Sequence, residues 1–400
     1  MWSFSSTIRC GLAAALLCST ACKDSELPSA PAGRAAPNFP LTVEAAGVAF
    51  ASVSAGGFHS CGATTAGAAY CWGYNFRGQL GNGTNIDSNV PVAVSGGHAF
   101  ASVSAGFNHS CGVTTDGAAY CWGNNFYGQL GNGTNSKSFV PVAVSGGHIF
   151  ASVSAGGEFH SCGMTTAGTA YCWGFGIYGQ LGNGTNSDSN LPVAVSGGHT
   201  FATVRAGFYH GCGVTTASTA YCWGYNPAGQ LGDGTNTDSN APVPVSGGHA
   251  FSSVTPGVGH SCGMTTVGAA YCWGFGFYGQ LGDGTNTDSN VPLAVSGGHT
   301  FASVDAAGIH SCGVTTDGTA YCWGANGSGQ LGNGTNTDSS VPAAVSGGQT
   351  FGSVSAHNDH SCGVATAGVA YCWGANGNGQ LGNGTNTDSN VPRRVRRNHA

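Results

Sequence analysis

A unit of about 50 residues recurs seven times from Phe50 onward, and this repetition limits the folds open to the chain. The second copy is FASVSAGFNHSCGVTTDGAAYCWGNNFYGQLGNGTNSKSFVPVAVSGGH. The copies differ in length only by one extra residue before the histidine of the third copy. Units of this size bury their apolar faces against their neighbours, so the repetition predicts a propeller or a solenoid. The repeated histidines are His59, His109, His160, His210, His260, His310 and His360.

Each copy contains four short segments rich in Val, Thr, Tyr, Trp and Cys, separated by Gly, Asn, Ser and Pro. In the second copy these segments are Phe100–Ala105, His109–Thr114, Ala118–Gly123 and Pro141–Val144. Short runs of β-forming residues between turn residues are typical of strands. Four strands in a repeat of about 40–50 residues indicate one propeller blade. We therefore expect an all-β chain, a seven-bladed β-propeller of four-stranded antiparallel blades.

Three pieces of the unit resemble the repeat of the regulator of chromosome condensation family. In the second copy they are Gly-x-x-His (106–109), Tyr-x-Trp-Gly (120–123) and Gly-Gln-Leu-Gly-x-Gly-Thr (128–134). The resemblance covers residues 49–395 and implies a seven-bladed β-propeller. The family includes a nuclear exchange factor for a small GTPase and secreted bacterial propellers, one of which inhibits β-lactamases. The resemblance alone therefore leaves the function open.

Composition excludes several other classes of protein. Only 6% of the residues are charged, against about 25% in an ordinary soluble domain, and 41% are hydrophobic, which excludes disorder through charge. The 71 glycines follow no three-residue period, which excludes collagen. No apolar run approaches the roughly 20 residues of a membrane-spanning helix. Between residues 49 and 392 only Arg77, Lys137 and Arg205 are basic, so this acidic body is unsuited to nucleic acid.

The N-terminal segment has the composition of an export signal. Arg9 precedes a short apolar stretch, Gly11 to Leu17, which small residues separate from Cys22. Small residues followed by cysteine resemble a bacterial lipobox, in which Cys22 becomes the lipid anchor, although Ser19 stands where that pattern prefers leucine. Ordinary cleavage after residue 21 is the alternative.

These features divide the chain into four parts. We expect a lipoprotein-like signal peptide over residues 1–21, a Pro/Ala-rich tether over 22–40, the propeller over 41–397 and a tail over 398–400. A Pro-x-x-Val segment ends every copy, and an eighth stands at Pro40 to Val43. Either terminal version could complete the last blade.

Fourteen of the 17 cysteines fall two per copy, on either side of a turn such as Thr115-Asp116-Gly117. In a three-residue hairpin loop that ends in glycine, the two cysteines of one copy stand directly opposite each other. Opposed residues have Cα atoms about 4.5–5.5 Å apart, which a disulfide accepts. We expect seven disulfides and an oxidising compartment, with a metal site or free thiols as alternatives. The pairs are Cys61–Cys71, Cys111–Cys121, Cys162–Cys172, Cys212–Cys222, Cys262–Cys272, Cys312–Cys322 and Cys362–Cys372.

Variation between copies gathers in two loops, one before the histidine and one after Trp-Gly. In an up-and-down blade both loops emerge on the same face of the disc. Copies one to five carry most of the aromatic side chains in these loops, and exposed aromatic residues are typical of interfaces. We expect a partner-binding face, with rings folded inward as the alternative. The residues are Phe58, Tyr74, Phe76, Phe107, Phe126, Tyr127, Phe159, Phe175, Tyr178, Phe208, Tyr209, Tyr225, Phe275, Phe277 and Tyr278.

Several chemical motifs occur in forms that do not support catalysis. Residues 174–179 and 274–279 match GxGxxG but open no helix, and residues 259–263 match GxSxG without a strand-to-helix elbow. Seven equivalent histidines do not make one asymmetric site, and we expect them to bond loop carbonyls. Loops such as Asp233 to Asp238 could bind calcium, although side chains capping their own turns explain them more simply.

The sequence therefore predicts a monomeric binding protein, exported or anchored to the bacterial cell envelope, with no catalytic residue, cofactor or metal. A protein is the expected partner, and a carbohydrate or cell-surface polymer is the alternative. A guanine-nucleotide exchange factor-like regulator is the alternative that the family resemblance implies. Nucleic acid is not an expected partner, and membrane contact is expected only through a lipidated N-terminus.

Overall fold

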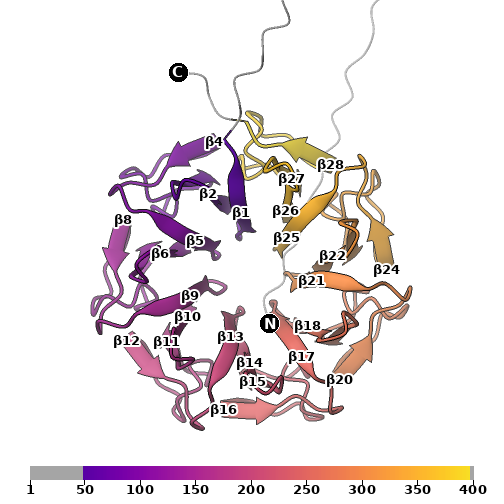
Figure 1. Ribbon diagram of the computed structural model, residues 1–400, viewed down its shortest axis with the longest axis horizontal. Helices are drawn as coiled ribbons and strands as arrows, with labels where there is room; N and C mark the ends of the chain where they lie inside the picture. The colour runs from indigo at the N-terminus through magenta and orange to yellow at the C-terminus, as the bar shows by residue number, and fades with distance from the viewer. Residues whose placement is uncertain (1–47, 397–400) are drawn as a thin grey trace, which may run out of the picture. The chain divides into compact units, whose positions relative to one another are not determined.

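A computed structural model describes residues 48–396, which form seven four-stranded antiparallel sheets arranged in a ring (Figure 1). Each sheet is one blade and comes from one copy of the repeat, so the predicted seven-bladed β-propeller is confirmed. Residues 48–396 contain no helix, and therefore none that is long and apolar enough to cross a membrane. The expected signal peptide, the tether with Cys22 and the tail lie outside the described residues.

The four strands of a blade follow one another from the central axis to the rim (Figure 1). The innermost strands are β1 (Phe50–Ala55), β5 (Phe100–Ala105), β9 (Phe150–Ala155), β13 (Phe201–Ala206), β17 (Phe251–Pro256), β21 (Phe301–Ala306) and β25 (Phe351–His357). The second strands are β2 (His59–Thr64), β6 (His109–Thr114), β10 (His160–Thr165), β14 (His210–Thr215), β18 (His260–Thr265), β22 (His310–Thr315) and β26 (His360–Ala365). The third strands are β3 (Ala69–Gly73), β7 (Ala119–Gly123), β11 (Ala170–Gly174), β15 (Ala220–Gly224), β19 (Ala270–Gly274), β23 (Ala320–Gly324) and β27 (Ala370–Gly374). The outermost strands are β4 (Ser88–Ala93), β8 (Ser138–Ala143), β12 (Ser189–Ala194), β16 (Ser239–Pro244), β20 (Ser289–Ala294), β24 (Ser339–Ala344) and β28 (Ser389–Arg394).

The first two predicted strands of the second copy have the observed bounds, and the last two do not. The third strand begins one residue late, and the fourth is Ser138–Ala143 instead of 141–144. The outermost strand starts early because Ser138 pairs with Gly123, after a register shift between Cys121 and Gly123. A break in register of this kind lets polar residues before the proline join the sheet.

The hydrophobic core lies between blades. At the junction of blades one and two, Leu80 and the half-cystines of β2 and β3 pack against Phe100, Val103 and Trp122 of the next blade. The same combination recurs at the other junctions. Each blade therefore buries both of its faces against its neighbours, which explains the low content of charged residues.

The ring closes by the same contacts between blades seven and one. Phe50, Val53 and Trp72 of blade one pack against the disulfide of blade seven, and Trp72 Nε1 donates to the Gln380 carbonyl at 2.9 Å. The C-terminal Pro-x-x-Val segment, residues 392–395, supplies the second half of β28, which completes the last blade, whereas residues 40–43 lie outside the described part.

Candidate binding face

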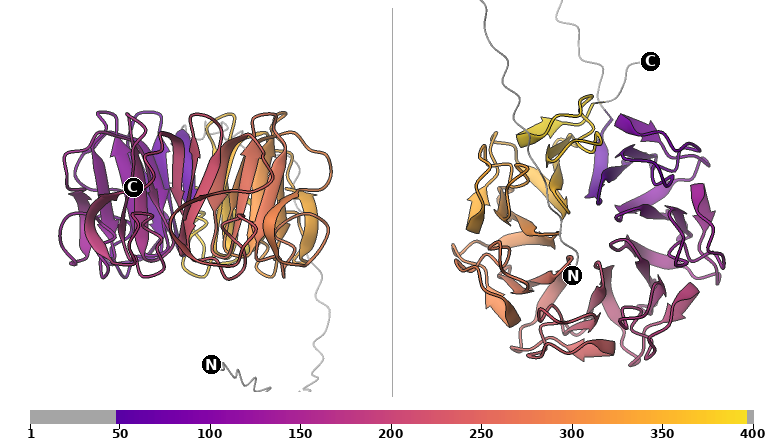
Figure 2. Two further views of the ribbon diagram at one scale, coloured as in Figure 1. Left: turned by 90° about the horizontal axis from the view of Figure 1, so that it is seen from below. Right: turned by 180° about the vertical axis from the view of Figure 1, so that it is seen from behind.

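The loops that join first to second strands and third to fourth strands lie together on one face of the ring, as predicted from the alternation of strand direction (Figure 2). In blade one, Phe58 from the first kind of loop contacts Tyr74 from the second, with ring centroids 6.2 Å apart. We call this face the aromatic face. The Thr-Thr-x-Gly turns lie at the opposite ends of the strands.

Ring contacts join the aromatic residues of blades one to four into one cluster. Phe58 packs against Phe107 with centroids 4.9 Å apart, and Phe107 reaches Phe208 of blade four at 5.8 Å. Phe208 continues to Phe159 at 5.5 Å. The other members are Tyr74, Phe76, Phe126, Tyr127, Phe175, Tyr178, Tyr209 and Tyr225. In blade five, Phe275, Phe277 and Tyr278 form a separate set of ring contacts.

The rings form a half-buried layer with exposed tips. Phe76, Phe126, Tyr178 and Phe277 keep 53%, 71%, 37% and 64% of their surface exposed. The remaining aromatic residues of the face are half-buried. The face therefore combines inward packing with exposed apolar rings, and aromatic contacts of this kind hold rings in fixed positions.

The innermost strands line a central channel with a volume of about 590 Å³. Near the aromatic face, one side chain per blade forms a ring that links neighbouring blades. For example, the Ala105 N–H donates to Ser54 Oγ at 3.0 Å, and the Ala356 N–H donates to Asp305 Oδ2 at 3.0 Å. The ring consists of Ser54, Ser104, Ser154, Arg205, Thr255, Asp305 and Ser355.

Blade four lacks the hydrogen-bond acceptor of this ring, and blade five lacks the matching donor. Arg205 stands where the other blades carry an acceptor, and a guanidinium group accepts no hydrogen bond. In the other blades the N–H that needs this acceptor belongs to the alanine at or next to the end of the next innermost strand. In blade five Pro256 stands at this position, and proline has no N–H, so no donor is left without an acceptor. Burial raises the pKa of Asp305, and the positive charge of Arg205 opposes this shift. Within the innermost strands, Arg205 and Asp305 are the only arginine, lysine or acidic residues.

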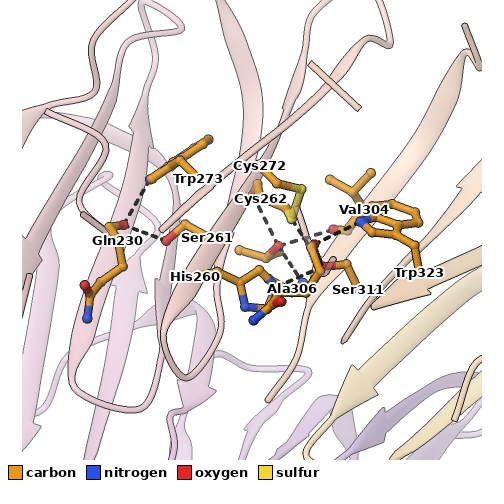
Figure 3. The surroundings of a disulfide bond; sticks show 12 residues. Gln230, His260, Ser261, Cys262, Cys272, Trp273, Val304, Ala306, Ser311 and Trp323 are labelled. Atoms are coloured by element: carbon orange, nitrogen blue, oxygen red, sulfur yellow. Dashed lines mark hydrogen bonds between the residues drawn. A yellow bond between two sulfur atoms is a disulfide. The ribbon is translucent and has the colours of Figure 1, made fainter. Parts of the chain in front are cut away.

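All seven expected disulfides are present, and Figure 3 shows the one that joins Cys262 to Cys272. The paired cysteines are directly opposed in the sheets, as the hairpin loop predicts. Their Cα atoms are 4.0–4.1 Å apart, slightly closer than expected. Each disulfide lies in the core between blades, where Ser311 Oγ of the next blade approaches Cys262 Sγ at 3.5 Å. Because disulfides persist under oxidising conditions, the seven disulfides are consistent with an extracellular environment.

Six of the seven repeated histidines bond a serine of the next blade, whereas the sequence predicted loop carbonyls as their partners. In Figure 3, Ser261 Oγ and Trp273 Nε1 both donate to the Gln230 carbonyl at 2.9 Å, and His260 Nε2 lies 2.8 Å from Ser311 Oγ. Because each serine gives its one proton to a carbonyl, the histidine must donate through Nε2. Its Nδ1 has no partner among the described residues. Burial lowers the pKa of His260 to about 3, so the imidazole is neutral and enclosed.

The loops considered for calcium are filled by an amide group. Asn226 Nδ2 donates to the carbonyls of Thr235 and Thr237, and Asn226 Oδ1 accepts from the Leu231 N–H at 2.8 Å. The oxygen atoms that would face a cation are therefore already engaged. In blades three and five, Gly176 and Gly276 replace this asparagine and the loop moves into the vacated space. Residues 48–396 contain no group of three or more His, Cys, Asp or Glu side chains suited to a metal.

Sequence reasoning missed one charged residue of the aromatic face. Glu158 is the extra residue of the third copy, and its Oε1 accepts from Asn108 Nδ2 at 3.2 Å. Its carboxylate is half-buried, and burial raises its pKa. The single change in repeat length was the signal that could have identified it.

Comparison with known proteins agrees with this architecture. The model of the regulator of chromosome condensation (RCC1) repeat matches residues 66–113, 116–162, 167–214, 219–264, 268–314, 317–364 and 367–399. The fold is similar to that of human WBSCR16, with a TM-score of 0.75 and 21% identity over 82% of this chain and 93% of that one. It is also similar to yeast RCC1 (Prp20) in its crystal structure bound to Kap60, with a TM-score of 0.72 and 22% identity over 82% and 83% of the two chains. A structure of Prp20p from Saccharomyces cerevisiae, described with its binding to Gsp1p and histones, gives the same score and identity over 82% and 85%. Because the repeat model matches most of its length, the chain belongs to the regulator of chromosome condensation repeat family.

Proposed function

We propose that this protein is an exported or surface-anchored binding protein that recognises another protein through its aromatic face. The observation that carries the proposal is the exposure of Phe76, Phe126, Tyr178 and Phe277 on one face, above a layer of packed rings. Phenylalanine and tyrosine provide a large contact area at low cost in conformational entropy. The packed layer beneath holds the exposed rings in place before a partner arrives, which lowers the cost of binding.

Export is supported by the disulfides and by the sequence before the propeller. Fourteen cysteines are paired, which suits an oxidising compartment. After cleavage at residue 21, Cys22 would be the one cysteine left without a partner in its own repeat, and lipidation would account for it. A lipidated Cys22 would hold the propeller at the membrane surface by the tether over residues 22–40.

The similar yeast structures support a protein as the class of partner, because Prp20 is described with Kap60, Gsp1p and histones as its partners. Exchange activity on a small GTPase is the second candidate, and family membership is the observation that favours it. The disulfides argue against a cytosolic or nuclear site of action. Measured release of guanine nucleotide from candidate GTPases would separate these two functions.

The proposal is tested by affinity capture from cell-envelope extracts. Wild-type propeller is compared with a variant carrying Phe126→Ala, Tyr127→Ala and Tyr178→Ala, and bound proteins and glycans are identified by mass spectrometry. The control is Val267→Ala, which removes a side chain that is 80% exposed on the opposite face. Circular dichroism and non-reducing peptide mapping establish that each variant is folded and fully disulfide-bonded.

We expect the aromatic variant to lose a specific protein that both the wild type and the Val267→Ala control retain. Loss of about tenfold or more in affinity for that purified protein would correspond to the removal of interface anchors. Identical captures by all three proteins would reject the aromatic face as the binding surface. Loss of a glycan alone would favour the carbohydrate alternative.

A further inference from the structure

Glu158 occupies an unusual environment for a carboxylate. It lies in the loop between β9 and β10, where it is the one insertion among seven copies. The Gln129 side-chain amide donates to the Glu158 carbonyl at 3.0 Å, which fixes the loop, whereas the equivalent amide nitrogens of Gln79, Gln180 and Gln280 have no partner among the described residues. The inserted residue is therefore held in a defined position.

The carboxylate of Glu158 is half-buried without a cation. Its one hydrogen-bond donor is the Asn108 amide, and no basic side chain within residues 48–396 lies at ion-pair distance. Arg77 is near enough to oppose the rise in the pKa of Glu158 that burial causes, but the two side chains form no ion pair. Removing a carboxylate from water without pairing it costs free energy, so a retained carboxylate of this kind is a candidate for function.

Aromatic rings pack against the residue that follows Glu158 in the same loop. Phe159, the next residue, stacks on Tyr209 with centroids 5.4 Å apart, and Tyr127 packs on Phe159 at 5.3 Å. Tyr178 contacts Tyr209 at 5.4 Å. Gln129 joins Tyr127 to Glu158, because its Oε1 accepts from the Tyr127 N–H at 2.9 Å while its Nε2 donates to the Glu158 carbonyl at 3.0 Å. Burial raises the pKa of Tyr209, and Tyr178 and Glu158 raise it further. Ring faces attract cations, and a carboxylate beside them adds a full negative charge.

We propose that Glu158, Tyr127, Tyr178 and Tyr209 recognise an arginine or lysine side chain of the partner. This inference rests on the proposed function and names the chemistry that the aromatic face selects. Charge complementarity supports it, because 13 acidic residues and three basic residues lie between residues 49 and 392. A planar guanidinium can lie on a ring while donating to the carboxylate, which makes arginine the better match of the two.

The test uses small probes, so it does not require the partner. Saturation-transfer NMR measures binding of Nα-acetyl-arginine amide and of Nα-acetyl-citrulline amide, its uncharged isostere, to the folded propeller. The variants are Glu158→Gln, which keeps the shape of the side chain, and Tyr178→Ala. The control variant is Asp359→Asn, which removes a partly buried carboxylate from blade seven, where the corresponding loops carry no aromatic residue.

We expect the arginine probe to bind at least about threefold more tightly than the citrulline probe, and Glu158→Gln to remove this preference. Asp359→Asn should leave the preference unchanged. Equal binding of the two probes, or an unchanged preference in Glu158→Gln, would overturn the inference even if the affinity capture upholds the aromatic face. Conversely, if the wild type, the aromatic variant and the Val267→Ala control capture the same proteins while the arginine preference persists, the proposed protein partner is rejected and the cation site is retained.

Discussion

At the scale of single residues, the seven copies of the repeat serve as references for one another. Six blades place a serine after the repeated histidine, and that serine bonds the histidine of the preceding blade. Blade four has Gly211 at this position, so His160 Nε2 is left without a partner among the described residues. An unsatisfied buried donor costs about 1–3 kcal/mol.

Gly211→Ser should therefore stabilise the protein by about 1 kcal/mol, because the new hydroxyl would accept from His160 and donate to the Gln180 carbonyl. A Cβ atom at this position would lie 2.7 Å from Trp223 Nε1, so the indole has to shift slightly, as the other blades allow. Gly211→Ala is the matched control, because it brings the same crowding without the hydroxyl and should destabilise. Chemical denaturation of both variants measures the difference, and equal stability would show that the hydrogen bond contributes nothing.

At the scale of the strand and the hairpin, the sequence was sufficient for most of the architecture. Turn chemistry sets the hairpin register, and this register alone is enough to place Cys111 opposite Cys121. The histidine partners could not be predicted, because they belong to a neighbouring blade and the repeat reveals periodicity, not which side chains meet across a junction. The same limit applies to two other features that depend on contacts between blades. One is the occurrence of Pro256 in the blade next to Arg205, and the other is the hydrogen bond from Asn108 to Glu158.

The hairpin between β14 and β15 offers a test of the turn chemistry. Ser218 has a φ of 64°, whereas the other six hairpins place glycine at this position. For a residue with a side chain, this left-handed conformation costs about 1–2 kcal/mol in the folded state. Glycine avoids that strain but loses more conformational entropy on folding, which costs about 0.5–1 kcal/mol. Ser218→Gly should therefore raise stability by about 0.5–1 kcal/mol, while Ala217→Gly, at a residue without a positive φ, should lower it. Thermal unfolding of both variants provides the comparison, and a loss of stability in Ser218→Gly would contradict the strain argument.

At the scale of the whole molecule, the ring is held by seven similar junctions, each of which buries one neutral histidine. Each repeated imidazole is completely buried and donates to a serine of the next blade, except at the junction of blades three and four. Burial lowers the pKa of His59, His109, His160, His210, His260 and His310 to about 3, and lowers the pKa of His360 well below its usual value. Because the junctions follow one another around a closed ring, protonation at any one of them opposes closure of the propeller.

This arrangement predicts a steep loss of stability in mild acid. An unfolded histidine binds a proton near pH 6.5, whereas the folded ones do not until about pH 3, so the unfolded chain takes up protons first as the pH falls. Each histidine then lowers the free energy of unfolding by up to about 1.4 kcal/mol per pH unit below pH 6.5. Burial raises the pKa of Asp305, Asp359 and Glu158, and these carboxyl groups oppose the loss at the acid end. Chemical denaturation at several pH values between about pH 8 and pH 5 measures the free energy of unfolding, and its slope against pH should correspond to the uptake of several protons on unfolding. In His210→Gln this number should fall by about one. A free energy of unfolding that stays constant over the range would show that the histidines have the same pKa in the folded and unfolded states.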